Sequence, residues 1–140
     1  KRAIVVGENS YGKGSVQSVN RLPNDGELIL TWSRIVTPSG YVLHNLGVLP
    51  NICTYQKEIN AKKVITKTLR KSERLIRSLQ KWRKVSYSDL HQRKALRKFC
   101  RPSQKEKNID ILIAERLISD TSLYSQIRDI SPPLLANNNL

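Results

Sequence analysis

The chain contains no methionine, a single phenylalanine and only two cysteines, and acidic residues are scarce. Its 140 residues carry 25 Lys and Arg against 11 Asp and Glu, which gives a formal net charge of +14. No run of 18 apolar residues occurs, so the sequence encodes no transmembrane helix. Because methionine is missing even at position 1, we expect the sequence to be a piece of a longer protein.

The excess positive charge is confined to the middle of the chain. Residues 56–107 hold 18 Lys and Arg against 4 Asp and Glu, while the remaining residues hold 7 of each sign. A block of this charge attracts phosphates, whether in nucleic acid or at an anionic surface. The cations are spread around a helix and match no nucleic-acid motif, so we expect a solvated basic face and no nucleic-acid binding.

The first third of the chain has the pattern of short strands and turns. Residues 2–6, RAIVV, predict a strand buried on both faces. Residues 15–36 alternate around the turn signal PNDG at 23–26, which predicts an antiparallel hairpin. The segment TPSGY at 37–41 predicts another turn.

Helical periodicity follows this first third. Apolar residues at spacings of three, four and seven predict one amphipathic helix over residues 57–83. We expect a shorter helix over residues 86–99, capped by Ser88, and a docked helix over residues 109–118. Asp120 is expected to cap one more short helical turn.

Lys13 lies between Gly12 and Gly14 in the stretch VVGENSYGKGSVQSV. A phosphate-binding P-loop is excluded, because its lysine precedes Ser or Thr and a helix, and here glycine and a strand pattern follow. A solvated turn lysine is the plain interpretation. A catalytic lysine must be neutral to accept a proton, which requires burial or an uncharged partner. The flanking glycines would allow burial, and Gln17 offers an uncharged amide.

Four motifs in register resemble the catalytic core of the carboxyl-terminal processing peptidases, also called tail-specific proteases. They are VVGE at 5–8, GKGSVQ at 12–17, TPSG at 37–40 and GVLPNI at 47–52. Their order and spacing also agree with the family pattern. The resemblance covers roughly the first third of the chain, and beyond Cys53 no motif is carried over.

The resemblance implies a serine endopeptidase with a Ser-Lys dyad that cleaves near the C-termini of exported proteins. Lys13 would be the general base and Gln17 the amide that orients it, with no cofactor and no metal. The family's nucleophilic serine and its peptide-binding PDZ domain belong upstream and are absent from these residues. Ser10 and Ser15 lie outside the nucleophile's motif, so we expect this chain alone to be inactive.

The implied fold class is α/β, a partial crotonase-like or Clp-protease-like ββα core followed by a helical C-terminal extension. We expect the C-terminal part of the peptidase core in residues 1–53 and a basic helical extension in residues 54–107. Residues 108–140 would form a C-terminal helix and tail.

The resemblance implies that the substrates are proteins or peptides. It also implies a periplasmic or membrane-associated location in bacteria, and the membrane association could be peripheral. The alternative is a non-catalytic truncated remnant, or a basic module that binds nucleic acid or anionic surfaces.

Other titratable residues carry weaker signals. His44 and His91 are expected to be surface or packing residues, because no acid lies at a useful position near His44. Asp25 and Glu27 flank a turn and are expected to be solvated. Tyr41 either lines a substrate groove or packs against the core.

The two cysteines leave two interpretations open. Cys53 and Cys100 are too far apart in sequence for a CxxC metal or redox motif. They are either two buried free thiols, because cysteine packs as a small hydrophobe, or one disulfide. The disulfide would suit the extracytoplasmic location implied by the resemblance and would pin the basic helices onto the core. Nothing in the sequence sets the distance between the two side chains.

Overall fold

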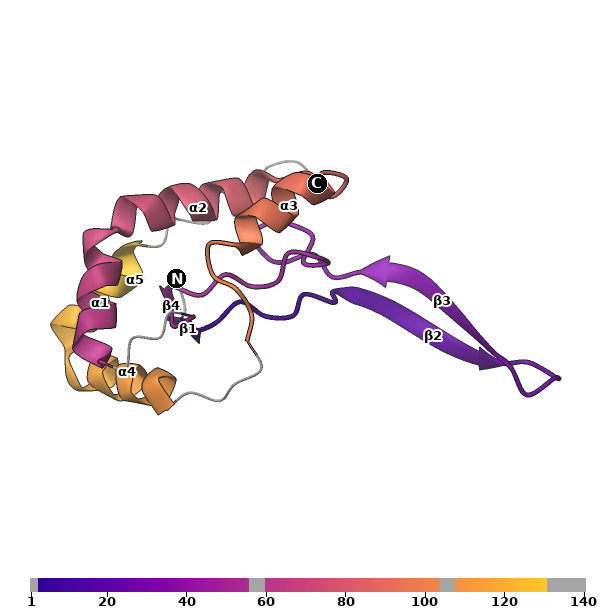
Figure 1. The fold of residues 1–140 in the computed structure, drawn as a ribbon, viewed down its shortest axis with the longest axis horizontal. Helices are drawn as coiled ribbons and strands as arrows, with labels where there is room; N and C mark the ends of the chain where they lie inside the picture. Colours follow the sequence, from indigo (N-terminus) through magenta and orange to yellow (C-terminus); the bar gives the residue numbers. More distant parts are fainter. Residues whose placement is uncertain (1–2, 56–59, 104–107, 131–140) are drawn as a thin grey trace.

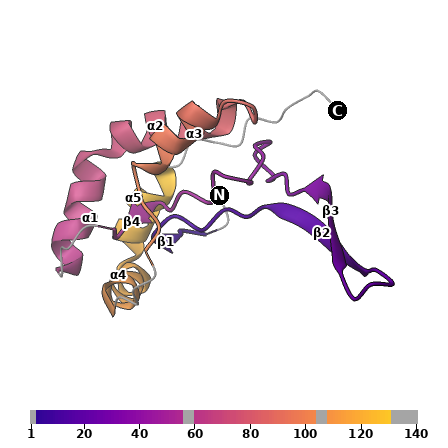
Figure 2. The ribbon, with the colours of Figure 1, turned by 45° about the vertical axis from the view of Figure 1, so that its right-hand side comes forward.

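The structure of the protein is a computed structural model that describes residues 3–55, 60–103 and 108–130. Within these ranges, helices form a body from which one long hairpin projects (Figure 1). Figure 2 shows the same projection from a second direction. The predicted mixed α/β class is confirmed at this level.

The strands of the described part form two separate two-stranded sheets. β1 (Val6–Gly7) pairs in parallel with β4 (Ile52–Cys53) inside the body. β2 (Ser15–Arg21) pairs antiparallel with β3 (Glu27–Arg34) and forms the projecting hairpin. The hairpin predicted from alternation is therefore confirmed.

Helices account for most of the remaining described residues. They are α1 (Ala61–Arg70), α2 (Ser72–Lys84), α3 (Leu90–Arg97), α4 (Asn108–Ser119) and α5 (Thr121–Ile130). α1 packs against α4 and β4, α2 packs against α3 and α5, and α4 also packs against β1. The small parallel sheet thus packs against α1 and α4.

The first strand differs from its prediction. β1 begins only at Val6, and Val5 is 45% exposed, so RAIVV is not buried on both faces. A strand is covered on both faces only when other layers lie above and below it. Here β1 has one strand partner, β4, and packs against one helix, α4.

The single helix predicted over residues 57–83 is wrong. The chain leaves helical geometry at Lys71, where φ is −106° and ψ is 21°, and α1 and α2 meet there at a bend (Figure 1). Each half packs on a different neighbour, α1 on α4 and α2 on α5, so the halves take different directions. The apolar periodicity continues across the bend and therefore did not reveal it. Residues 57–59 lie outside the described ranges.

Helix capping agrees with the sequence at one of two predicted positions. Asp120 Oδ1 accepts a hydrogen bond from the backbone N–H of Leu123 at 3.0 Å, as predicted for the start of α5. The prediction that Ser88 caps the N-terminus of α3 is wrong. Asp89 Oδ1 caps this helix by accepting from the Gln92 N–H at 2.8 Å. A carboxylate one residue further on takes the capping role, so α3 is shorter than expected.

The apolar core lies mainly among the helices. Its buried apolar members, among the described residues, lie in the helices, just after them, or in and just before β4. They are Leu46, Leu49, Ile52, Val64, Ile65, Leu75, Trp82, Val85, Cys100, Ile109, Ile113, Leu117, Ile127 and Ile130. The three parts predicted from the sequence, residues 1–53, 54–107 and 108–140, all contribute described residues to this one core. The boundaries proposed between those ranges stay a prediction.

A disulfide joins the first third of the chain to the helices. Cys53 and Cys100 are bonded, with Cα atoms 5.9 Å apart, and no cysteine is left free. Of the two interpretations left open by the sequence, the structure shows the disulfide. It connects β4 to the end of the α3 region. None of the helices in the described ranges has the length and apolarity needed to cross a bilayer.

Candidate functional site

The Lys13 loop lies at the base of the hairpin and requires its two glycines. Gly12 has φ +79° and Gly14 has φ +51°, a region that favours glycine. A Cβ atom on Gly14 would lie 2.5 Å from the backbone nitrogen of His44, and one on Gly12 would lie 2.7 Å from that of Gly47. The loop therefore presses closely against the 44–47 backbone.

Hydrogen bonds hold the loop in this position. The Asn45 N–H donates to the Gly12 carbonyl at 2.8 Å, and the Ile35 N–H donates to the Gly14 carbonyl at 2.9 Å. The His44 ring nitrogen Nδ1 contacts the Lys13 carbonyl. Because a carbonyl oxygen can only accept, Nδ1 must carry the proton in this contact. All three loop carbonyls thus have a donor.

The Lys13 side chain itself is exposed. The flanking glycines allow the close approach of the backbone but do not bury the lysine stem. A lysine base needs desolvating or neutral surroundings. The described residues alone do not provide that desolvation, so the loop is positioned while its amine remains open to solvent.

Gln17 lies on β2 immediately after a register shift of the ladder. The shift falls between Val16 and Gln17, and such a bulge re-aims the side chain that follows it. Gln17 Nε2 donates to the Thr31 hydroxyl on β3 at 2.9 Å, while the amide remains exposed. The bond orients the amide, and its Oε1 atom is the group that can accept from a lysine amine.

The other sequence candidates have structural contacts. Ser10 Oγ accepts from the Val48 N–H at 3.0 Å, and Ser15 is paired with Arg34 in the hairpin ladder. The Tyr41 hydroxyl donates to the Gly47 carbonyl at 3.4 Å. Burial raises the pKa of the Tyr41 phenol, and the charge of Arg83 partly opposes this rise. Tyr41 packs against the core, which fits the structural alternative.

Sequence reasoning missed two residues around the loop, Arg93 and Arg97, and gave His44, which contacts the Lys13 carbonyl, only a surface or packing role. Arg93 is 1% exposed and donates to the carbonyls of Val42 and His44, and Arg97 donates to the carbonyl of Leu46. Burial lowers the pKa of both guanidinium groups, but arginine remains protonated in proteins. No sequence signal distinguishes these two arginines from the other cations of the basic block.

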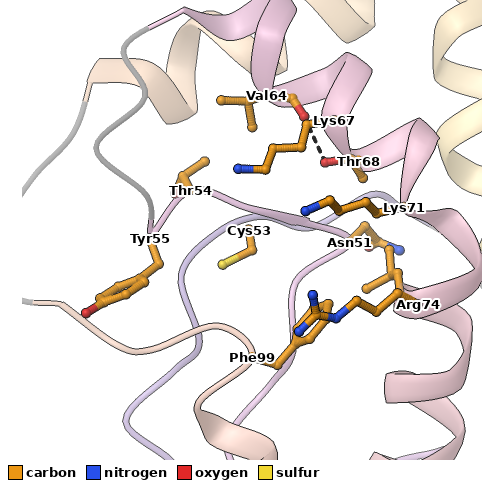
Figure 3. A pocket seen from close by; sticks show the side chains of 11 residues that line it. Asn51, Cys53, Thr54, Tyr55, Val64, Lys67, Thr68, Lys71, Arg74 and Phe99 are labelled. Atoms are coloured by element: carbon orange, nitrogen blue, oxygen red, sulfur yellow. Dashed lines mark hydrogen bonds between the residues drawn. The ribbon is translucent and has the colours of Figure 1, made fainter.

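A separate hollow of about 150 Å³ lies where α1 and α2 face β4 (Figure 3). Lys67, Lys71 and Arg74 extend into its lining from the helices, and the Arg74 guanidinium lies 5.7 Å from the centre of the Phe99 ring. Neither Lys13 nor Gln17 lines this hollow. Within the described ranges, no group of three His, Cys, Asp or Glu side chains is placed to hold a metal ion.

Residues 1–54 are similar in sequence to a family of peptidases. These residues match the model of peptidase family S41, and the match spans the motifs VVGE, GKGSVQ, TPSG and GVLPNI. The resemblance inferred from the four motifs is therefore confirmed for this part of the chain.

The named relatives agree with the family match. Over 56 residues the chain is 41% identical to a carboxy-terminal-processing protease of Bartonella bacilliformis, covering 40% of this chain and 13% of that protein. Over 51 residues it is 43% identical to the chloroplastic carboxyl-terminal-processing peptidase 2 of Arabidopsis thaliana, covering 36% of this chain and 10% of that protein.

A carboxyl-terminal-processing protease of Picosynechococcus sp. is 34% identical over 58 residues, covering 41% of this chain and 14% of that protein. The matched part of the chain thus spans only 10% to 14% of the length of these curated relatives. No solved structure gives a significant match.

Proposed function

We propose that this chain carries the lysine half of a Ser-Lys peptidase site of the carboxyl-terminal processing type. Lys13 is the general base and Gln17 is the amide that orients it. The observation that supports this most directly is the Lys13 loop, whose three carbonyls are all held while its amine is left open. A general base needs a fixed backbone and an amine that the serine hydroxyl can reach, and the loop has both features.

In the proposed reaction a serine hydroxyl attacks the scissile carbonyl of a protein or peptide. Lys13 Nζ takes the hydroxyl proton and passes it to the departing amine nitrogen, which leaves an acyl-enzyme. Water then attacks the ester. Its proton moves to Nζ and from there to the serine oxygen, so the free acid and the starting enzyme are restored.

We further propose that a segment outside these 140 residues supplies the serine and the PDZ domain. The hairpin supports this proposal, because Val19, Ile29 and Trp32 are all exposed on it. A lone two-stranded hairpin is at best marginally stable in water. Covering it would complete a crotonase-like or Clp-protease-like core and would also desolvate Lys13.

For the location we propose the periplasm or the outer face of a membrane, with peripheral membrane association of the basic helices. The Cys53–Cys100 disulfide supports an oxidising compartment, because disulfides persist there and are rare in the cytosol.

The experiment is a chimera in which the 140-residue chain replaces the matching part of the Bartonella bacilliformis protease. We expect the chimera to cleave an unstructured protein and this chain alone to be inactive. Lys13→Ala should lower turnover by about 10²- to 10⁴-fold, the range for general bases, and Gln17→Ala should lower it less. Lys94→Ala, on the exposed side of α3, is the matched control. Near-normal turnover in Lys13→Ala would exclude it as the base.

One observation favours the second candidate, a basic module for anionic surfaces. Lys67, Lys71 and Arg74 gather around one hollow rather than being spread evenly. Vesicles that contain anionic lipid would then bind the chain, and the double variant Lys71→Gln with Arg74→Gln would bind more weakly than Lys84→Gln. Nucleic acid is expected to bind only non-specifically, with Kd about 10⁻⁴ to 10⁻⁶ M at physiological salt.

A further inference from the structure

We propose that helix α3 of the basic extension positions the catalytic lysine, acting through Arg93 and His44. The role of Lys13 as a base rests on the proposed function, whereas the mechanical link between α3 and its loop does not. Arg93 and His44 are positioning residues in this proposal, because neither is placed against a substrate.

The first step of the link is the buried guanidinium of Arg93. Its Nη2 atom donates to the carbonyls of Val42 and His44 at 2.5 and 2.6 Å, and Nη1 donates to that of Ser86 at 3.4 Å. The group also lies over the ring of Tyr87, 5.6 Å from its centre. A buried charge is tolerated only when it is well hydrogen-bonded, so these carbonyls are held firmly.

The second step runs from His44 to Lys13. The His44 carbonyl is held by Arg93, and its side chain donates from Nδ1 to the Lys13 carbonyl. Its backbone also lies directly against Gly14, where no Cβ fits. A displacement of His44 must therefore displace the peptide of Lys13.

A parallel contact from the next turn of α3 supports the other side of the loop. Arg97 Nη1 donates to the Leu46 carbonyl at 2.9 Å, which also accepts from Asn9 Nδ2 at 3.1 Å. The same guanidinium nitrogen lies close to Gly12 and Gly47. Two arginines one helical turn apart thus hold the segment on which the loop rests.

The disulfide attaches the C-terminal end of α3, from which Arg93 and Arg97 reach the loop segment, to the core. Cys100 lies just beyond the end of α3, and its bond to Cys53 attaches the helix to β4. α3 is therefore anchored to the core at one end and holds the loop segment along its length. The basic extension is, in this proposal, part of the peptidase site rather than an appendage.

The test is hydrogen exchange in the 140-residue chain, which needs no activity. The amides of Asn45 and Ile35 report on the loop, because they donate to the carbonyls of Gly12 and Gly14. The amide of Thr54, which donates to Gly7, is the core reference. Arg93→Gln should speed exchange at the two loop amides by about ten-fold, with Thr54 unchanged. Lys94→Gln, the exposed neighbour on α3, should change none of them.

His44 provides a second, milder set of variants if Arg93→Gln does not fold. His44→Ala should speed exchange at the same two amides, whereas His44→Asn, whose side-chain N–H can replace Nδ1–H, should restore protection. A merely structural role would speed all three amides together and would show no rescue. That outcome, or unchanged exchange in Arg93→Gln and His44→Ala, overturns the proposal.

The catalytic consequence is measured in the Bartonella bacilliformis chimera. His44→Ala should lower kcat with KM unchanged, and His44→Asn should restore kcat. An inactive parent chimera would contradict the proposed function and leave the exchange experiment to decide the positioning role. Full activity of His44→Ala in an active chimera would overturn the positioning role alone.

Discussion

The two tryptophans of the chain show how different the hairpin and the helical body are. Trp32 lies on β3 and is 68% exposed, while Trp82 lies on α2 and is 1% exposed. The Trp82 indole Nε1 also donates to the Gly47 carbonyl at 3.3 Å. The same residue type is thus a solvated surface group in one region and a central core residue in the other.

The residues that match the peptidase family model are largely different from the residues that form the apolar core. Residues 1–54 carry the peptidase match, yet only Leu46, Leu49 and Ile52 of the fourteen buried apolar residues in the described ranges come from them. The described residues beyond position 54 supply the others. We infer that the apolar stability of this chain resides mainly in the part without a family match.

The largest effect expected from this comparison comes from Trp82. Trp82→Ala should lower the free energy of unfolding by about 3 to 5 kcal/mol, because it leaves a cavity and removes one of the two donors to the Gly47 carbonyl. Trp32→Ala, the matched change on the hairpin, should change it by no more than about 0.5 kcal/mol. Urea unfolding of both variants measures the contrast. Equal losses would show that the hairpin is folded against a core of its own.

The link between the two regions can be broken at the disulfide. Cys53→Ala combined with Cys100→Ala should lower the free energy of unfolding by about 4 kcal/mol, the chain-entropy value for a loop of this length. Dithiothreitol should destabilise the parent by a similar amount and leave the double variant unchanged. A parent insensitive to complete reduction would show that packing alone holds α3 against β4.

A smaller effect is expected within the body at the start of α5. Asp120→Ala removes the acceptor of the Leu123 N–H and should cost about 1 kcal/mol of unfolding free energy. Asp120→Asn keeps an oxygen acceptor and should retain most of the stability. A loss as large in Asp120→Asn as in Asp120→Ala would point to charge rather than capping.

The smallest effect concerns the exposed surface of α2. Arg77 and Glu73 form an ion pair at 2.9 Å, with both side chains mostly in solvent. Arg77→Gln should lower the free energy of unfolding by only about 0.3 to 0.5 kcal/mol, and the difference should vanish at 1 M salt. A salt-independent loss of 1 kcal/mol or more would mean that the Arg77 stem packs against the body.

Local elements of the fold were well predicted where one pattern specified them. Alternation around PNDG predicted the β2–β3 hairpin, and the apolar content of residues 109–118 predicted α4 within one residue at each end. The break at Lys71 was missed, because the apolar stripe is continuous through it. The exposure of Val5 was missed as well, since an apolar run does not state how many layers will cover it.

The candidate site was predicted only in part, because some of its contacts join segments that are far apart in the sequence. Lys13 and Gln17 stand in one short motif and could be named from it. His44 lies 31 residues from Lys13, and Arg93 lies 51 residues from the Val42 carbonyl that it contacts. Contacts at such separation leave no periodic signal, and one arginine among many cations has nothing to distinguish it.

The sequence by itself determined the elements whose cause is local, including the glycines of the Lys13 loop, the turn of the hairpin and the helical stripes. Tertiary structure alone decided which of these elements meet. It paired Cys53 with Cys100, buried Trp82 while leaving Trp32 in water, and placed Arg93 behind His44. The physical reason is that burial and hydrogen-bond partners are properties of two chain segments brought together, and neither segment encodes its partner.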